Sequence, residues 1–182
     1  MNFANKISTF RILSVPFFIA MLYYSRGNES LRVVALVIFI IAVFSDAIDG
    51  YIARKTKQKS QAGLVLDPLA DKLLLVSAFI SLYLFGEFPF WVALVVITRD
   101  IIITLGAVVI YMVKHNLNIA STIFGKIATI AQMLTVIVTL LRFQFLHIFW
   151  WVTVILTIIS GIIYVMRGFK ILYAPDNSRN NS

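Results

Sequence analysis

The chain has 182 residues, of which 60% are hydrophobic and only 13% are charged, and its mean hydropathy is +0.93. Soluble domains carry about 25% charged residues, so this composition excludes an ordinary soluble domain and indicates an integral membrane protein. The net charge of +8 would suggest nucleic acid as a partner of a soluble protein, but in a membrane protein the positions of the cations matter more, and we expect no nucleic-acid partner. The absence of cysteine excludes disulfides, thiolate metal sites and cysteine nucleophiles.

Apolar segments long enough to span the bilayer, at ~20 residues for ~30 Å of hydrocarbon, follow one another along the whole chain. The first resembles a signal peptide but ends without a small-residue cleavage pattern, so it is interpreted as a retained helix. We expect an all-α integral membrane protein with six transmembrane helices in one bundle and a cytoplasm-facing polar cavity. This membrane domain covers residues 1–173, and the Asn- and Ser-rich tail 174–182 is expected to be disordered. The six segments are 5–24, 33–53, 64–86, 88–113, 119–141 and 146–166.

The basic residues are distributed unequally between the two sides that alternate loops define. One side has only Arg26, Arg32 and Arg142. By the positive-inside rule, the richer side is cytoplasmic, so both termini and the 54–60 loop are predicted to lie in the cytoplasm and the protein in the cell (inner) membrane. The richer side has Lys6, Arg11, Arg54, Lys55, Lys57, Lys59, Lys114, Arg167, Lys170 and Arg179.

Four aspartates interrupt the second and third apolar segments, where an unpaired charge is costly and is by default a functional-site hypothesis. In the second segment Asp46 and Asp49 fall on one helical stripe with Gly50 and Ala53. In the third segment Asp67 and Asp71 are four residues apart and share a face. The short basic loop between the segments predicts antiparallel neighbouring helices, so all four acids can converge near the cytoplasmic surface.

Four converging carboxylates could not all stay ionised without cations. Oxygen ligands favour Mg²⁺ or Mn²⁺ over zinc, and two such ions form the clamp used in phosphoryl transfer. Gly50 and Ala53 leave room for a ligand against the helix, Gly63 lets the third helix begin close to its neighbour, and Arg54 can meet phosphate oxygens. The alternatives are a proton or sodium relay for the acids and simple helix packing for Gly63.

The complete pattern resembles the signature of the CDP-alcohol phosphatidyltransferase family at every position. It consists of Asp46, Asp49, Gly50, Ala53, Arg54, Gly63, Asp67 and Asp71. The segment from Leu66 to Lys72, the opening residues 5–11, and Gly125-Lys126 with Thr129 and Gln132 are similar to the bacterial phosphatidylglycerophosphate synthase and cardiolipin synthase branches of that family.

The resemblance implies transfer of a phosphatidyl group from CDP-diacylglycerol to an alcohol, with release of CMP. It implies that Asp46, Asp49 and Asp67 bind two divalent ions, and that Asp71 ligates one of them and acts as the general base. Gly50, Ala53, Arg54 and Gly63 would border the CDP moiety. A homodimer is compatible with the family, although no sequence feature establishes one.

The choice of acceptor depends on cations outside the signature. Arg99 in the middle of the fourth segment and Lys126 early in the fifth both invite a phosphate, which favours glycerol 3-phosphate as acceptor. The alternatives are that Arg99 pairs with Asp100 or a signature acid, and that Lys126 reaches the nearby interface. Lys72 is interpreted as a charge that can balance the acidic cluster.

Three further interpretations stay open. Many phosphatidylglycerophosphate synthases have Glu after the fourth-helix Arg and a second Arg eight positions later, where this chain has Asp100 and Ala107. The run Thr98-Arg99-Asp100 is equally similar to cardiolipin synthases, whose acceptor is phosphatidylglycerol. A small cation or proton carrier, or a non-catalytic membrane scaffold, are the alternatives from other functional classes.

Overall fold

The computed structural model is all helical over the residues that it describes. It describes the backbone of residues 3–56, 61–114 and 122–173, and the side chains of residues 10–45, 72–110, 112 and 122–172. The six expected helices are confirmed, and their ends lie within four residues of the apolar segments except at the end of the sixth, which was expected at residue 166 and lies at Tyr173 because the helix continues through the basic residues that follow. They are α1 (Phe3–Tyr24), α2 (Glu29–Thr56), α3 (Gln61–Leu84), α4 (Phe90–Lys114), α5 (Ile123–Leu140) and α6 (Leu146–Tyr173). The tail 174–182 lies outside the described residues.

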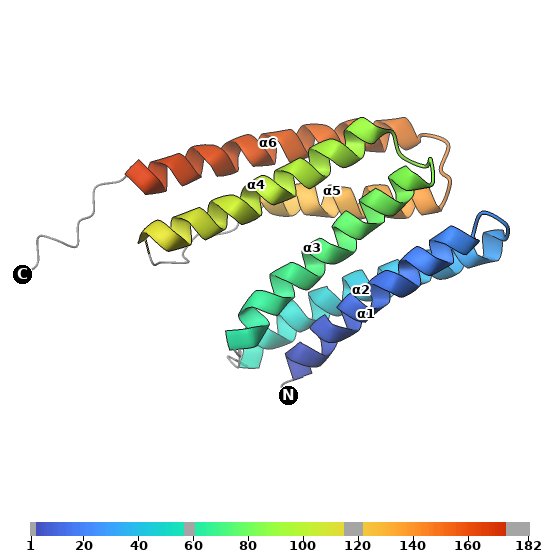
Figure 1. Ribbon diagram of the computed structural model, residues 1–182, viewed down its shortest axis with the longest axis horizontal. Helices are drawn as coiled ribbons and strands as arrows, with labels where there is room; N and C mark the ends of the chain where they lie inside the picture. Colours follow the sequence, from blue (N-terminus) through green and yellow to red (C-terminus); the bar gives the residue numbers. More distant parts are fainter. Residues whose placement is uncertain (1–2, 57–60, 115–121, 174–182) are drawn as a thin grey trace, which may run out of the picture.

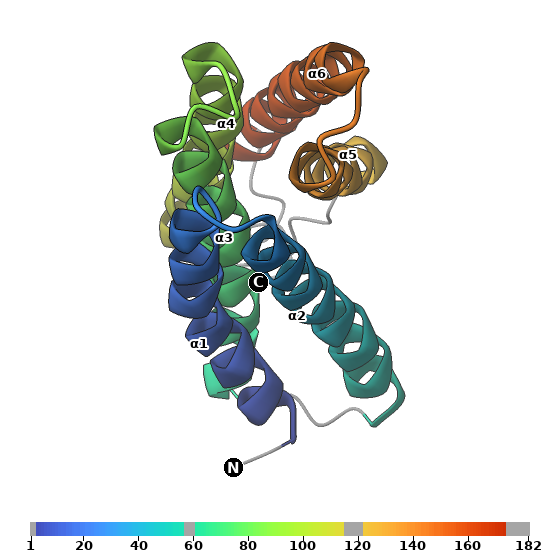
Figure 2. The same cartoon turned by 90° about the vertical axis from the view of Figure 1, so that its right-hand side faces the viewer.

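The helices form two groups of three. α1 packs against both α2 and α3, whereas α6 packs against both α4 and α5, and contacts of α3 with α4 and of α2 with α5 join the groups. The connections after α1, α3 and α5 lie together at one end of the molecule, and from there the two groups diverge (Figure 1). The view along the bundle shows the same separation, with α4, α5 and α6 on one side and α1, α2 and α3 on the other (Figure 2). The charge distribution of the sequence assigns the connections after α1, α3 and α5 to the side with few basic residues, and this requires the three to lie at the same end of the molecule.

The interior is filled mainly by Phe, Leu, Val and Ala. Phe18 of α1 and Phe39 of α2 have ring centroids 5.7 Å apart, and Phe79 of α3 lies 5.1 Å from Phe88 in the connection to α4. Val136 of α5 and Val154 of α6 belong to the same buried cluster. One continuous core therefore joins both groups of helices.

The outer surfaces of the helices are also apolar. Large hydrophobic side chains such as Phe17, Phe44, Leu84, Met112 and Met166 are each at least 60% exposed. Within the described residues, three stretches are long and apolar enough to cross a bilayer: Phe90–Ile110, Ile123–Leu140 and Leu146–Leu172. An apolar core inside an apolar surface is what a lipid-embedded bundle requires, because its solvent is hydrocarbon.

Candidate active site

The eight signature positions lie on two helices of one group. Asp46, Asp49, Gly50, Ala53 and Arg54 belong to the C-terminal part of α2, and Gly63, Asp67 and Asp71 belong to the N-terminal part of α3. These two helices run in opposite directions and both pack against α1. The side chains of all eight residues lie outside the described part of the structure, so their convergence and their roles stay predictions.

The described side chains of α3 begin at Lys72, one residue after Asp71, and they take part in a cluster of charges between α3 and α4. Lys72 of α3 donates a hydrogen bond from Nζ to Oδ1 of Asp100 in α4, over 2.8 Å. Arg99 donates from Nη1 to the same oxygen, over 2.7 Å. The side chain of Asp100 is only 4% exposed, so a buried carboxylate is compensated by two cations that meet at one of its oxygens.

Arg99 extends this cluster to the last two helices. Its Nη2 donates to Oγ of Ser160 in α6 over 2.7 Å and lies 3.5 Å from the carbonyl oxygen of Gly125 in α5. At Gly125 a Cβ would lie only 3.0 Å from Oγ1 of Thr122, so glycine keeps this capping hydroxyl uncrowded, while Nη2 of Arg99 would be at an ordinary contact distance of 3.5 Å. Four helices therefore contribute to one polar cluster, and Arg99 lies at its centre.

The polar cluster has an excess of positive charge and unused hydrogen-bonding capacity. Lys72 and Arg99 face a single described carboxylate, that of Asp100. Nε of Arg99 and Oδ2 of Asp100 are buried and make no hydrogen bond within the described residues. A buried net positive charge is stabilised by a nearby anion, so this environment favours a phosphate group or a carboxylate of the signature as a neighbour.

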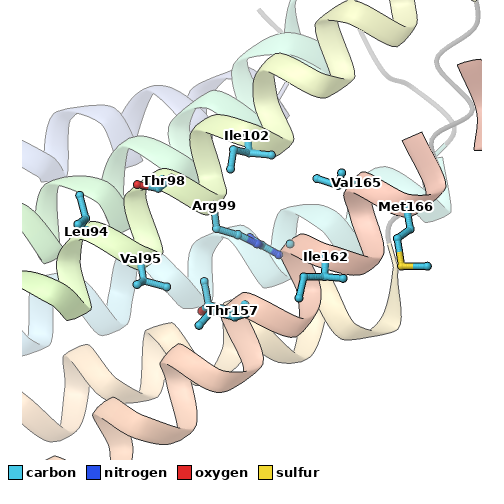
Figure 3. A pocket seen from close by; sticks show the side chains of 11 residues that line it. Leu94, Val95, Thr98, Arg99, Ile102, Thr157, Ile162, Val165 and Met166 are labelled. Atoms are coloured by element: carbon cyan, nitrogen blue, oxygen red, sulfur yellow. The ribbon is translucent and has the colours of Figure 1, made fainter. Parts of the chain in front are cut away.

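Arg99 also lines a groove of about 510 Å³ between α4 and α6. The groove is otherwise formed mainly by apolar side chains, among them Leu94, Ile102 and Ile162, with Thr98 and Thr157 as further polar members. Figure 3 shows the Arg99 side chain pointing from α4 toward α6 between these residues. An apolar groove with a guanidinium among its lining side chains suits a ligand with a hydrocarbon part and an anionic part.

The second predicted acceptor residue, Lys126, lies in the first turn of α5. This turn is capped by Thr122, whose Oγ1 accepts a hydrogen bond from the backbone N–H of Gly125 over 2.9 Å. Lys126 is exposed, whereas Arg99 is 6% exposed. Lys126 directly follows Gly125, which lies beside Arg99, but the two cationic side chains differ in exposure. The ion pair between Arg99 and Asp100 is one of the alternatives that the sequence left open for Arg99, and the structure contains it.

Sequence reasoning missed the shared use of Asp100 and the contribution of Ser160. From the sequence, Arg99 is the expected partner of Asp100, and nothing in the spacing along the chain points to Lys72 as a second partner. Ser160 and Gly161 are small residues in an otherwise apolar helix, which is a weak signal because such residues also serve helix packing. The hydrogen bond between Ser160 and Arg99 depends on how α4 and α6 pack.

The donor set for metal is chemically suitable. The signature supplies four carboxylates from α2 and α3, and hard divalent cations prefer such oxygen ligands. Among the residues whose side chains are described, no group of three or more His, Cys, Asp or Glu could hold a metal ion.

The family model for CDP-alcohol phosphatidyltransferases matches residues 1–159. The chain belongs to this family. Members of the CDP-alcohol phosphatidyltransferase family use a divalent metal ion for catalysis, and the signature carboxylates are the residues of this chain that suit one.

Relatives with similar sequences match between 73% and 94% of the chain. The CDP-diacylglycerol–glycerol-3-phosphate 3-phosphatidyltransferase of Bacillus subtilis is 34% identical, over 94% of this chain and 97% of its own length. A protein of Mycobacterium tuberculosis named probable phosphatidylglycerophosphate synthase is 33% identical, over 93% of this chain and 82% of its own. The Haemophilus influenzae protein with the same name as the Bacillus enzyme is 36% identical, over 73% of this chain and 72% of its own.

Proposed function

We propose that this protein transfers the phosphatidyl group of CDP-diacylglycerol to glycerol 3-phosphate, giving phosphatidylglycerophosphate and CMP. The observation that carries the proposal is the similarity to enzymes named for this reaction, over 94% of the chain for the Bacillus subtilis enzyme and 73% for the Haemophilus influenzae enzyme. The excess positive charge around Arg99 agrees with it, because glycerol 3-phosphate brings an anion. Multi-pass insertion in the cell (inner) membrane, with both termini and the active site on the cytoplasmic side, agrees with the charge distribution of the sequence.

Each predicted site residue has a role in this reaction. Asp46, Asp49, Asp67 and Asp71 would hold two Mg²⁺ or Mn²⁺ ions, which supply Lewis-acid stabilisation of the diphosphate charge. Gly50, Ala53 and Gly63 leave room for the CDP moiety, and Arg54 donates hydrogen bonds to phosphate oxygens. Arg99 and Lys126 bind the phosphate of the acceptor.

The proton balance of the transfer assigns the base. The acceptor hydroxyl oxygen forms a bond to the phosphorus that carries the diacylglycerol, and the bond from this phosphorus to the CMP oxygen breaks. The proton of the hydroxyl passes to the carboxylate of Asp71, and CMP leaves as a phosphate monoester. A carboxylate among three others is suited to this role, since neighbouring negative charges raise its affinity for a proton.

The groove beside Arg99 favours a second candidate. An acceptor with acyl chains, phosphatidylglycerol, could place hydrocarbon between α4 and α6 and its phosphate near the guanidinium. The product would then be cardiolipin, with CMP again released. The two candidates differ only in the acceptor, so a direct comparison of acceptors separates them.

The test is an acceptor assay on the purified full-length protein in lipid nanodiscs that contain CDP-diacylglycerol. CMP release is measured with glycerol 3-phosphate, with phosphatidylglycerol and with neither, each in Mg²⁺, in Mn²⁺ and in EDTA. The proposal expects metal-dependent CMP release with glycerol 3-phosphate, and transfer of labelled glycerol 3-phosphate into the lipid fraction. Turnover with phosphatidylglycerol alone would establish the second candidate, and turnover in EDTA would contradict the mechanism.

A further inference from the structure

The carboxylate of Asp100 connects two parts of the site that lie on different helices. Its Oδ1 accepts a hydrogen bond from Lys72, which directly follows the predicted base Asp71 in α3. The same oxygen accepts from Arg99, the predicted acceptor residue of α4. Lys72 and Asp100 are 28 residues apart in sequence, so this contact fixes one helix against another.

Each half of this contact has a geometric consequence. In an α-helix consecutive residues differ by a rise of ~1.5 Å, so holding Lys72 against α4 also holds the backbone position of Asp71. On the other side, Arg99 is held by Asp100 at Nη1 and by Ser160 at Nη2. Two hydrogen bonds to different nitrogens fix the plane of a guanidinium as well as its position.

Charge explains why this position needs a carboxylate. Lys72 and Arg99 both approach within 2.8 Å of one oxygen, and the Asp100 side chain is 4% exposed. Without the negative charge, the two cations would repel one another in a poorly solvated environment and move apart. Asparagine has the same shape and still offers one acceptor oxygen, but it would not neutralise the two cations and so would hold them much less firmly.

We propose that Asp100 is a positioning residue, whose Oδ1 links Lys72 of the signature helix to Arg99 and thereby sets the spacing between the catalytic base and the acceptor site. This role rests on the proposed function. It assigns no contact with the substrate to Asp100. A displacement of ~1 Å between reacting groups can cost ~10²-fold in rate, so a link of this kind has a measurable effect.

The experiment compares Asp100→Asn, Asp100→Glu and Lys72→Met with the wild type in nanodiscs, with kcat and the KM for the acceptor measured separately. Asp100→Asn keeps the shape and loses the charge, so we expect kcat/KM to fall ~10²-fold, through both a lower kcat and a higher acceptor KM. Asp100→Glu keeps the charge and should recover part of this loss. Lys72→Met leaves Asp100 and Ser160 to hold Arg99, so it should lower kcat and leave the acceptor KM near the wild-type value.

The double variant Asp100→Asn with Lys72→Met tests the link itself. Because the charge attraction between Lys72 and residue 100 is already lost in Asp100→Asn, the second change should add little, whereas independent sites would show multiplied effects. Glu29→Gln is the matched control, since it removes the carboxylate of an exposed ion pair with Arg142, between the start of α2 and the connection after α5. Its kcat and KM should equal those of the wild type.

The outcomes separate the positioning role from the proposed function. If the wild type is active, either of two results overturns the positioning role alone: Asp100→Asn has the same kcat and KM as the wild type, or the effects of the two changes multiply in the double variant. A folded wild type that releases no CMP with either acceptor overturns the proposed function, and the positioning role with it. If Asp100→Asn is not recovered as a folded protein, Lys72→Met decides through kcat, because its side chain is 28% exposed and its loss removes only one partner of Asp100.

Discussion

Arg32 is the residue whose removal we expect to destabilise the fold most clearly. It lies in the first turn of α2 and is 6% exposed. Its Nη1 and Nη2 donate to the two carboxylate oxygens of Glu87, over 2.5 and 3.0 Å. Its Nε donates to the carbonyl oxygen of Leu140, and its Nη2 also to that of Thr139, each over 2.8 Å. One guanidinium thus joins α2, the connection before α4 and the end of α5.

Replacement of Arg32 by Met removes all four hydrogen bonds and keeps most of the side-chain volume. Loss of one partner of a buried ion pair costs ~3–5 kcal/mol, because the other charge stays without compensation. The side chain of Glu87 is 25% exposed and can regain some hydration, so the lower limit of about 3 kcal/mol applies here. For a chain of this length, this corresponds to a decrease in Tm of about 6–12 °C.

The assay is thermal unfolding of the purified protein in detergent, followed by tryptophan fluorescence or near-UV circular dichroism. The control is Glu29→Gln, which breaks the exposed pair between Arg142 and Glu29, whose side chains are 58% and 81% exposed. Exposed pairs contribute about 1 kcal/mol or less, so the control should shift Tm by no more than about 4 °C. Equal Tm values for the two variants would refute the conclusion that Arg32 holds the two helix groups together.

Three further predictions concern catalysis and pH. Asp71→Asn should lower kcat by ~10²–10⁴-fold in the CMP-release assay, because it removes the proposed general base, and full activity would contradict that role. Arg99→Ala should raise the KM for glycerol 3-phosphate by about 10–100-fold, the equivalent of one charge-assisted hydrogen bond, and an unchanged KM would remove Arg99 from the acceptor site. Because Lys126 is exposed, Lys126→Ala should raise this KM less. Hydrogen bonds from Arg32 hold the pKa of Glu87 below its ordinary value of 4.5, against the opposing effect of burial, so the stabilisation is complete above pH 4.5 and is lost as the pH falls below this value through the folded-state pKa. Tm should therefore fall on acidification below pH 4.5 in the wild type and fall less in Arg32→Met; parallel curves for the two proteins would contradict this.

The helices could be predicted closely because their signal is local. A run of about 20 apolar residues between charged or turn-forming residues defines a helix without reference to the rest of the chain. The end of α3 is an example of such a local signal. Gly86, in the turn that follows α3, has φ +77°, a conformation that glycine adopts without strain. The sequence has no comparable local signal for which helices pack around α1 and which around α6. The buried face and the exposed face of most helices are equally apolar, so composition does not distinguish them.

The candidate site was predictable in part. The spacing of Asp46, Asp49, Gly50 and Ala53 places them on one helical stripe, which is a property of a single helix. The sequence also marked Arg99 as a cation that needs an anion, and the structure provides Asp100 as one such partner. It did not predict that Lys72 shares this carboxylate, since that contact depends on the packing of α3 against α4.

By itself, the sequence determined the membrane environment, the six helices, the family signature and the charge asymmetry, because each depends on composition or on spacing within one segment. Only the tertiary structure decided which distant polar groups meet. Lys72 reaches a partner 28 residues away, Arg99 one 61 residues away and Arg32 one 108 residues away. Buried polar groups must find hydrogen-bond partners, but the packing of apolar helix faces determines which partners come within reach.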